Sequence, residues 1–191
     1  MPQIQLSSSS SAHYHAAMTI RRRKKIAKRR HTRVQPGLDR IDVAILDRLQ
    51  DDGRITNAAL AATVGIGPTA CLARVRKLEI AGVIRGYAAI VDPEAVGQAV
   101  TALASVQLRQ HGAAELAAFK QAIAGFEQVQ SCWHLAGDDD FVLKIVAADL
   151  ADYERFVTGQ LSSLENLGRV RTSIVLSSVK EGTRLPLPKP A

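Results

Sequence analysis

The sequence predicts an α+β protein with an N-terminal helix-turn-helix domain followed by a ferredoxin-like βαββαβ domain. Residues 38–82 show three helical patterns separated by glycines. Residues 99–177 show strand and helix patterns in the order βαββαβ. Charge supports the division, because residues 1–36 carry nine basic and no acidic side chains, whereas residues 92–183 carry seven basic and twelve acidic ones. The front of the chain is therefore expected to meet a polyanion, and the back is not.

The composition argues against several other classes of protein. No apolar run approaches the ~18 residues of a membrane span, and no apolar run follows the basic cluster as in a signal peptide. The two cysteines, Cys71 and Cys132, lie far apart and match no metal spacing. We expect two buried, reduced thiols in a cytoplasmic protein that has no metal and no cofactor.

Residues 1–36 are predicted to form a disordered basic arm. A serine run and two basic clusters dominate the segment, which has too few apolar side chains to offset chain entropy. An organelle transit peptide is less favoured because the amphipathic apolar face of such peptides is missing. A misplaced translation start is a further alternative, with Met18 as an internal candidate.

Residues 37–82 are predicted to form the helix-turn-helix domain, with helices over 38–50, 57–64 and 68–81. Residues that start or stop helices flank each one: Asp39 with Asp42, Thr56, Gly65, Pro68 and Gly82. A short second helix, a turn of a few residues and a longer third helix are typical of a helix-turn-helix.

The third helix is the candidate DNA-reading element. Its core face is expected to hold Cys71, Leu72, Val75 and Leu78. The predicted DNA-binding residues are Pro68, Thr69, Ala70, Ala73, Arg74, Arg76 and Lys77. The small side chains near the helix start suit thymine methyl groups and make few bidentate hydrogen bonds, whereas the basic ones suit phosphates. Binding is therefore expected to be degenerate in sequence. The alternative is a solvated basic helix face.

The rest of the chain is predicted to form a linking strand over 83–96, a regulatory domain over 97–183 and a tail over 184–191. Within the first, Val83–Val91 is the strand itself, closed by Asp92-Pro93. The regulatory domain has predicted strands over 99–109, 127–135, 141–147 and 168–177 and helices over 113–124 and 150–161. Helices on one side leave the other sheet face bare, so a second copy is expected to cover it.

Several motifs in this order resemble the Lrp/AsnC (feast/famine) regulators. They are the segments 38–42, 52–55, 64–69, 74–79 and 82–87, together with the turn 137–141. The resemblance covers about residues 38–183 and implies a winged-type helix-turn-helix joined to a ligand-binding domain. It also implies dimers that assemble further, commonly to octamers, and control of amino-acid metabolism genes. Two features depart from the family pattern: Gly67 stands where serine is usual, and the basic arm is long.

The predicted effector-binding residues are Gly137, Asp138, Asp140 and His134, around a turn that resembles the Gly-Asp-x-Asp-aromatic turn of that family. A carboxylate such as that of Asp138 can accept hydrogen bonds from an ammonium group, and Gly137 permits close backbone approach. An amino acid is therefore the expected effector, although its identity stays open. The alternative is an exposed acidic hairpin.

The leading hypothesis is a homo-oligomeric regulator that binds double-stranded DNA and responds to an amino acid. The runner-up is a nucleoid-organising DNA-binding protein without an effector, which the basic arm would also fit. An enzyme is not expected. Cys132 and His134 share one strand face, but no third group that could orient a catalytic dyad lies near them in sequence.

Overall fold

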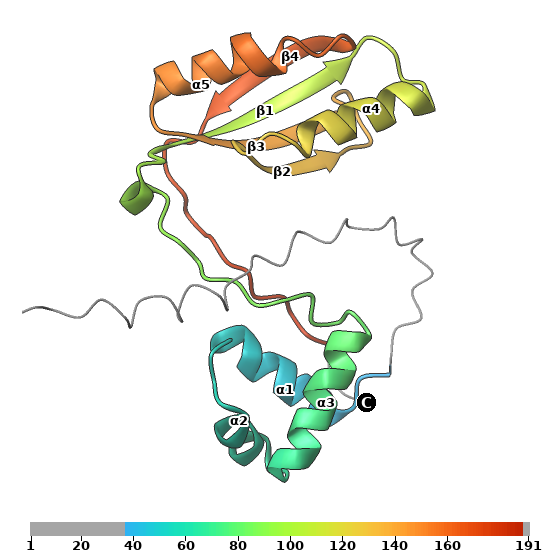
Figure 1. The fold of residues 1–191 in the computed structure, drawn as a ribbon, viewed down its shortest axis with the longest axis vertical. Coiled ribbons are helices and arrows are strands. Elements are labelled where there is room, and N and C mark those ends of the chain that lie inside the picture. Colours follow the sequence, from blue (N-terminus) through green and yellow to red (C-terminus); the bar gives the residue numbers. More distant parts are fainter. Residues whose placement is uncertain (1–36, 189–191) are drawn as a thin grey trace, which may run out of the picture. The chain divides into compact units, whose positions relative to one another are not determined.

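The computed structural model describes residues 37–188 (Figure 1). The predicted basic arm, residues 1–36, lies outside the described residues, as do residues 189–191. The helix-turn-helix domain consists of α1 (Arg40–Asp51), α2 (Asn57–Val64) and α3 (Pro68–Ile80). These bounds confirm the three predicted helices to within two residues at each end.

The ends of these helices follow from local chemistry. The Asp39 side chain accepts hydrogen bonds from the backbone N–H groups of Ile41 and Asp42, and Asp42 reciprocates toward the Asp39 backbone in a capping box. The Thr56 side chain caps α2 by accepting from the Ala59 N–H. Gly65 ends α2 in the left-handed conformation, with φ of 73°, which glycine adopts without a steric penalty.

A small apolar core holds the three helices together. Its members are buried: Ile45, Leu46, Leu60, Ala61, Cys71 and Leu78. The prediction placed Leu72 on the same face of α3, but that side chain is exposed. The core face is narrower than the sequence pattern indicated, because α1 and α2 pack along only one stripe of α3.

Between the two domains, residues 83–92 form neither a helix nor a strand, so the linking strand expected at Val83–Val91 is absent from the single chain. A strand needs a hydrogen-bonded neighbouring strand, and within residues 37–188 the sheet pairings include none for this segment. Glu94–Val96 form a short 3-10 helix (η1) that the sequence pattern did not predict.

The regulatory domain contains β1 (Val100–Leu108), α4 (Ala113–Ile123), β2 (Val129–His134), β3 (Phe141–Ala147), α5 (Leu150–Phe156) and β4 (Leu167–Ile174). The strands pair antiparallel in the order β2-β3-β1-β4, which confirms the ferredoxin-like topology. The predicted helix over 150–161 divides, since α5 passes into a π-helical turn (η2) at Val157–Leu161.

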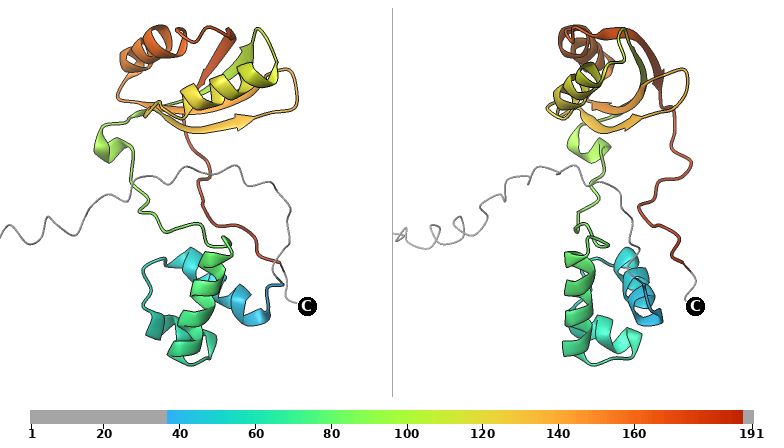
Figure 2. Two further views of the ribbon diagram at one scale, coloured as in Figure 1. Left: turned by 45° about the vertical axis from the view of Figure 1, so that its right-hand side comes forward. Right: turned by 90° about the vertical axis from the view of Figure 1, so that its right-hand side faces the viewer.

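Both helices of this domain lie on the same face of the sheet (Figure 2). The inward residues of the two central strands are apolar and buried, among them Ala104 and Val106 of β1 and Leu143 and Ile145 of β3. The opposite face keeps apolar groups in contact with solvent, since Leu103 is 39% exposed and Trp133 is 49% exposed. The bare sheet face that the sequence predicted is therefore present.

A tight approach between β4 and β1 lies beside the turn before β3. The pairing shifts register at Gln107/Leu108, and a Cβ on Gly168 would lie 2.8 Å from the Gln107 carbonyl oxygen. Glycine at this position therefore lets the two backbones meet.

Within residues 37–188, no single helix has the length and hydrophobicity of a membrane span, although α2 and α3, bent by 100°, meet those criteria together.

Candidate DNA-reading helix and effector turn

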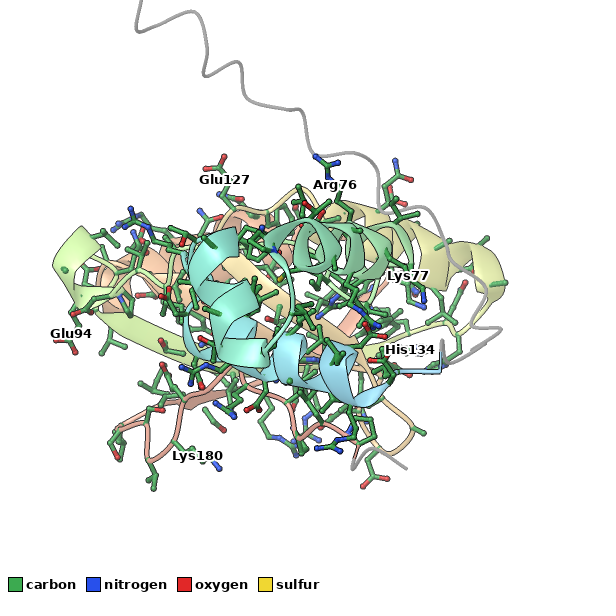
Figure 3. The ribbon with its side chains drawn as sticks, turned by 90° about the horizontal axis from the view of Figure 1, so that it is seen from below. Arg76, Lys77, Glu94, Glu127, His134 and Lys180 are labelled. Atoms are coloured by element: carbon green, nitrogen blue, oxygen red, sulfur yellow. The ribbon has the colours of Figure 1, made fainter. Side chains whose placement is uncertain are left out.

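The outer face of α3 presents small and basic residues that the sequence analysis predicted to bind DNA. Thr69, Ala70 and Ala73 are exposed. The side chains of Arg76 and Lys77 are also exposed and project away from the helix (Figure 3). Burial of Cys71 and Leu78 on the opposite stripe fixes this orientation. One surface thus offers methyl groups near the helix start and positive charge further along.

Arg74 differs from the other basic residues of α3, because it pairs within the domain. Its Nη1 lies 2.6 Å from Asp39 Oδ2 and 2.8 Å from Asp42 Oδ1. The Asp42 side chain is buried, with only 4% of its surface exposed. The backbone N–H of Asp42, and then the Arg74 guanidinium, hold the pKa of Asp39 below its ordinary value. Arg74 therefore fastens α3 to the start of α1.

The start of α3 carries no side-chain cap. Gly67 occupies the capping position and Pro68 the first helical position. The Asn57 side-chain amide of α2 donates to the Pro68 carbonyl oxygen at 2.8 Å. This contact positions the beginning of α3, including the predicted site residue Pro68, relative to α2.

The acidic turn between β2 and β3 uses two of its three carboxylates for bracing. Asp140 Oδ2 accepts from the Leu108 backbone N–H at 2.8 Å and lies 3.0 Å from His111 Nε2. Asp139 Oδ2 lies 2.7 Å from Arg171 Nη2 of β4. Both carboxylates are largely buried, and the Arg171 guanidinium together with the hydrogen bonds to Asp140 offsets the charge repulsion expected among three successive aspartates.

Asp138 remains as the outward carboxylate of the turn. The residue is exposed, and within residues 37–188 its side chain makes no hydrogen bond or ion pair. Its backbone carbonyl accepts a hydrogen bond from the Gln107 side-chain amide, which fixes the position of the peptide. Gly137 precedes it with φ of 158°, a value that residues with a Cβ rarely adopt. The turn therefore presents one unpaired carboxylate on a held backbone.

The predicted site residue His134 contacts other residues than these aspartates do. Its ring stacks on Phe141 with 4.7 Å between ring centroids, and its Nδ1 lies 3.4 Å from Lys120 Nζ of α4. The exposed Cys132 contradicts the expectation of a buried thiol. Partial burial still raises the pKa of the Cys132 thiol, and the charge of Lys120 offsets only part of that rise. A raised pKa and a histidine engaged elsewhere do not fit a nucleophilic dyad.

Sequence reasoning missed the residues that brace the turn. They are Gln107, Leu108, His111 and Arg171. These residues come from the end of β1, from the loop that follows it and from β4, so only the strand order β2-β3-β1-β4 brings them to the turn. A run of three aspartates does indicate that cationic partners are needed, but it does not say which ones.

Two family models match most of the described chain. The model of the AsnC-type helix-turn-helix domain matches residues 38–79. The model of the Lrp/AsnC ligand-binding domain matches residues 101–185.

Curated relatives match over nearly their full lengths. The leucine-responsive regulatory protein of Rhizobium meliloti is 44% identical over 154 residues, which are 81% of this chain and 99% of the relative. The transcriptional regulator AzlB of Bacillus subtilis is 40% identical over 150 residues, or 78% of this chain and 96% of AzlB. The leucine-responsive regulatory protein of Escherichia coli K12 is 37% identical, over 79% of this chain and 93% of its own.

Solved structures share the fold. A transcriptional regulator from Neisseria meningitidis in complex with L-methionine aligns with a TM-score of 0.75 at 34% identity, over 78% of this chain and 96% of that one. A feast or famine regulatory protein from M. tuberculosis, complexed with L-methionine, aligns with a TM-score of 0.70 at 31% identity, over 79% and 99%.

Proposed function

The chain belongs to the Lrp/AsnC family of transcription regulators, and on this basis we propose that α3 reads double-stranded DNA while the turn Gly137–Asp140 binds an amino acid. The observation that supports amino-acid binding is that the three aspartates of the turn differ in their contacts. Asp139 and Asp140 are engaged with Arg171 and His111, whereas Asp138 is free to accept hydrogen bonds. We place this action in the cytoplasm, because DNA is the partner.

For DNA, α3 supplies both kinds of contact. Thr69, Ala70 and Ala73 face the base edges and favour thymine methyl groups, and Arg76 and Lys77 contact phosphates. Few bidentate donors point to degenerate recognition that relies partly on DNA shape, with a preference for A·T-rich or bendable sites. Arg74 contributes by holding α3 against α1, through Asp39 and Asp42.

For the effector, the Asp138 carboxylate receives the ammonium group of an amino acid. The Gln107 amide and the conformation of Gly137 keep this carboxylate in place. Two structural neighbours carry L-methionine, and several relatives are named leucine-responsive, so both amino acids are the first to test.

For assembly, the bare sheet face forms a homodimer interface, and the dimers associate further. Leu103 of β1 and Trp133 of β2 are the apolar groups that a second copy would cover. Residues 83–92, which form no strand in the single chain, would gain a strand partner in the same assembly.

Calorimetric titration of the wild type and of Asp138→Ala with L-leucine and L-methionine tests the effector site. We expect wild-type binding, and a loss of 10- to 150-fold in affinity on removing a charge-assisted hydrogen bond. The matched control is Asp149→Ala, which removes an aspartate of the same domain that caps α5. Equal affinities of wild type and Asp138→Ala would place the ligand elsewhere. Absence of binding by the wild type across all twenty amino acids would favour a nucleoid-organising protein.

A further inference from the structure

The chain does not end at the sheet but returns to the helix-turn-helix domain. After β4, residues 175–188 form neither a helix nor a strand, and we call them the strap. The strap begins with a hydrogen bond from the Val175 N–H to the Thr101 carbonyl of β1 at 2.9 Å. Its far part contacts α1. Nothing in the function proposed above uses these residues.

A glutamine side chain holds the strap backbone on α1. The Leu185 N–H donates to Gln50 Oε1 at 2.6 Å, and Gln50 Nε2 donates to the Leu185 carbonyl at 3.2 Å. The two bonds satisfy both backbone polar groups of one residue, as a neighbouring strand would. Prolines at 186 and 188 favour the extended conformation that this contact needs.

An ion-pair cluster adds specificity to the same anchor. Arg184 Nη2 lies 2.6 Å from Asp47 Oδ1, and Arg184 Nη1 pairs with Asp51. Asp47, Gln50 and Asp51 are spaced i, i+3 and i+4, so they share one face of α1. All three charged side chains are about half exposed, which keeps each pair weak and sensitive to salt.

The helix that receives the strap is firmly joined to the DNA-reading helix. Ile45 and Leu46 bury the other side of α1 in the core that also holds Cys71 of α3. Arg74 of α3 pairs with the first turn of α1. Whatever restrains α1 therefore restrains α3.

We propose that the strap is a releasable second connection that restrains the helix-turn-helix domain, with Arg184 and Leu185 as its anchor on α1. The first connection is the covalent segment 81–99. A domain held at two points is less free to reorient than one held at a single point, and weak ionic contacts allow the second point to open. The significance of the restraint for regulation rests on the DNA-binding role proposed for α3.

Hydrogen exchange measures the anchor directly, because the Leu185 amide donates to Gln50. We expect this amide to exchange about tenfold more slowly in the intact wild-type protein than in Arg184→Ala, and the difference to shrink at high salt. The triple variant Arg184→Glu, Asp47→Lys, Asp51→Lys should restore slow exchange. Lys180→Ala is the matched control, since Lys180 belongs to the strap but points away from the ribbon (Figure 3).

Fluorescence anisotropy decay measures the restraint. A dye on Ala62→Cys, an exposed site of α2, reports the motion of the helix-turn-helix domain in a Cys132→Ser background, where the remaining Cys71 is buried. We expect Arg184→Ala, and a chain ending at Gly182, to add a fast component that the wild type and Lys180→Ala lack.

Equal exchange of the Leu185 amide in wild type and Arg184→Ala would overturn the anchor. Slow exchange combined with unchanged dye motion in the shortened chain would overturn the restraint. DNA binding is measured separately on the same samples. If the proposed DNA-binding function fails, the amide exchange and the dye motion still test the strap.

Discussion

Arg74 of α3 and the buried Asp42 of α1 form an ion pair with 2.8 Å between Nη1 and Oδ1. The same guanidinium also pairs with Asp39, the residue that caps α1. One basic residue of the helix that we propose reads DNA thus stabilises the fold, and its neighbours Arg76 and Lys77 remain exposed. Two classes of basic residue on one helix lead to different expectations for their removal.

Arg74→Ala is expected to destabilise the helix-turn-helix domain. It leaves the Asp42 carboxylate buried without its cation, which costs about 1–3 kcal/mol in the free energy of unfolding. Urea denaturation followed by helical circular dichroism measures the change, with Arg76→Ala as the exposed control. A variant Arg74→Ala as stable as Arg76→Ala would contradict the bracing role.

Arg76→Ala and Lys77→Ala are expected to weaken DNA binding without changing stability. Each lost phosphate contact should reduce the steepness of the negative slope of log K against log salt concentration by about 0.9. The loss should affect all DNA sequences alike. Titrations of an A·T-rich and a G·C-rich duplex at several salt concentrations provide the measurement. A loss confined to one duplex would instead indicate a base contact.

Acid should destabilise the helix-turn-helix domain partly through Asp39. The cap N–H of Asp42, followed by Arg74, lowers the pKa of Asp39 from its ordinary value of 3.8. Because the folded pKa is the lower one, its contribution is complete above 3.8 and is lost as the pH falls through the folded pKa. Asp39→Asn keeps a good helix cap, so it should show a weaker acid dependence of the urea midpoint below pH ~4. Identical acid profiles of the two proteins would refute this.

Gly168→Ala is expected to destabilise the regulatory domain and to weaken effector binding. Its Cβ would lie 2.8 Å from the Gln107 carbonyl oxygen, a clash that requires a backbone shift and costs about 1–3 kcal/mol. Gln107 holds the Asp138 carbonyl, so the shift reaches the turn. Thermal unfolding and ligand titration together measure both effects. Gly159→Ala, where a Cβ would meet nothing within 4 Å, is the control.

The sequence predicted the elements whose signals are local. Thr56 and Gly65 bound α2 at the expected residues, and β3 spans the expected 141–147. The capping box at Asp39 likewise follows from two aspartates that lie three positions apart. Such features depend on neighbours within one turn or one strand, so rules for periodicity and capping can predict them.

Features that depend on distant partners were missed or misplaced. The π-helical turn at Val157–Leu161 has no pattern of its own. The linking strand requires a partner that one chain does not supply. The pairing of Arg74 was not predicted because Asp39 and Asp42, 35 and 32 residues earlier, come into contact with it only after the helices pack. The pairing of Arg171 with Asp139 was missed for the same reason, because the two residues lie 32 positions apart in the sequence.

The Arg74 pairing also bears on how this regulator can change its target sites over generations. On α3, position 74 is tied to positions 39 and 42, so a mutation in one is tolerated best when the others change with it. These three positions should covary among homologues. We expect no such coupling for Thr69, Ala70 and Ala73, because their side chains are exposed and lie outside the core. Because we propose that Thr69, Ala70 and Ala73 face the bases, we expect a new binding preference to arise by single substitutions at these positions, while the scaffold that presents them is inherited unchanged.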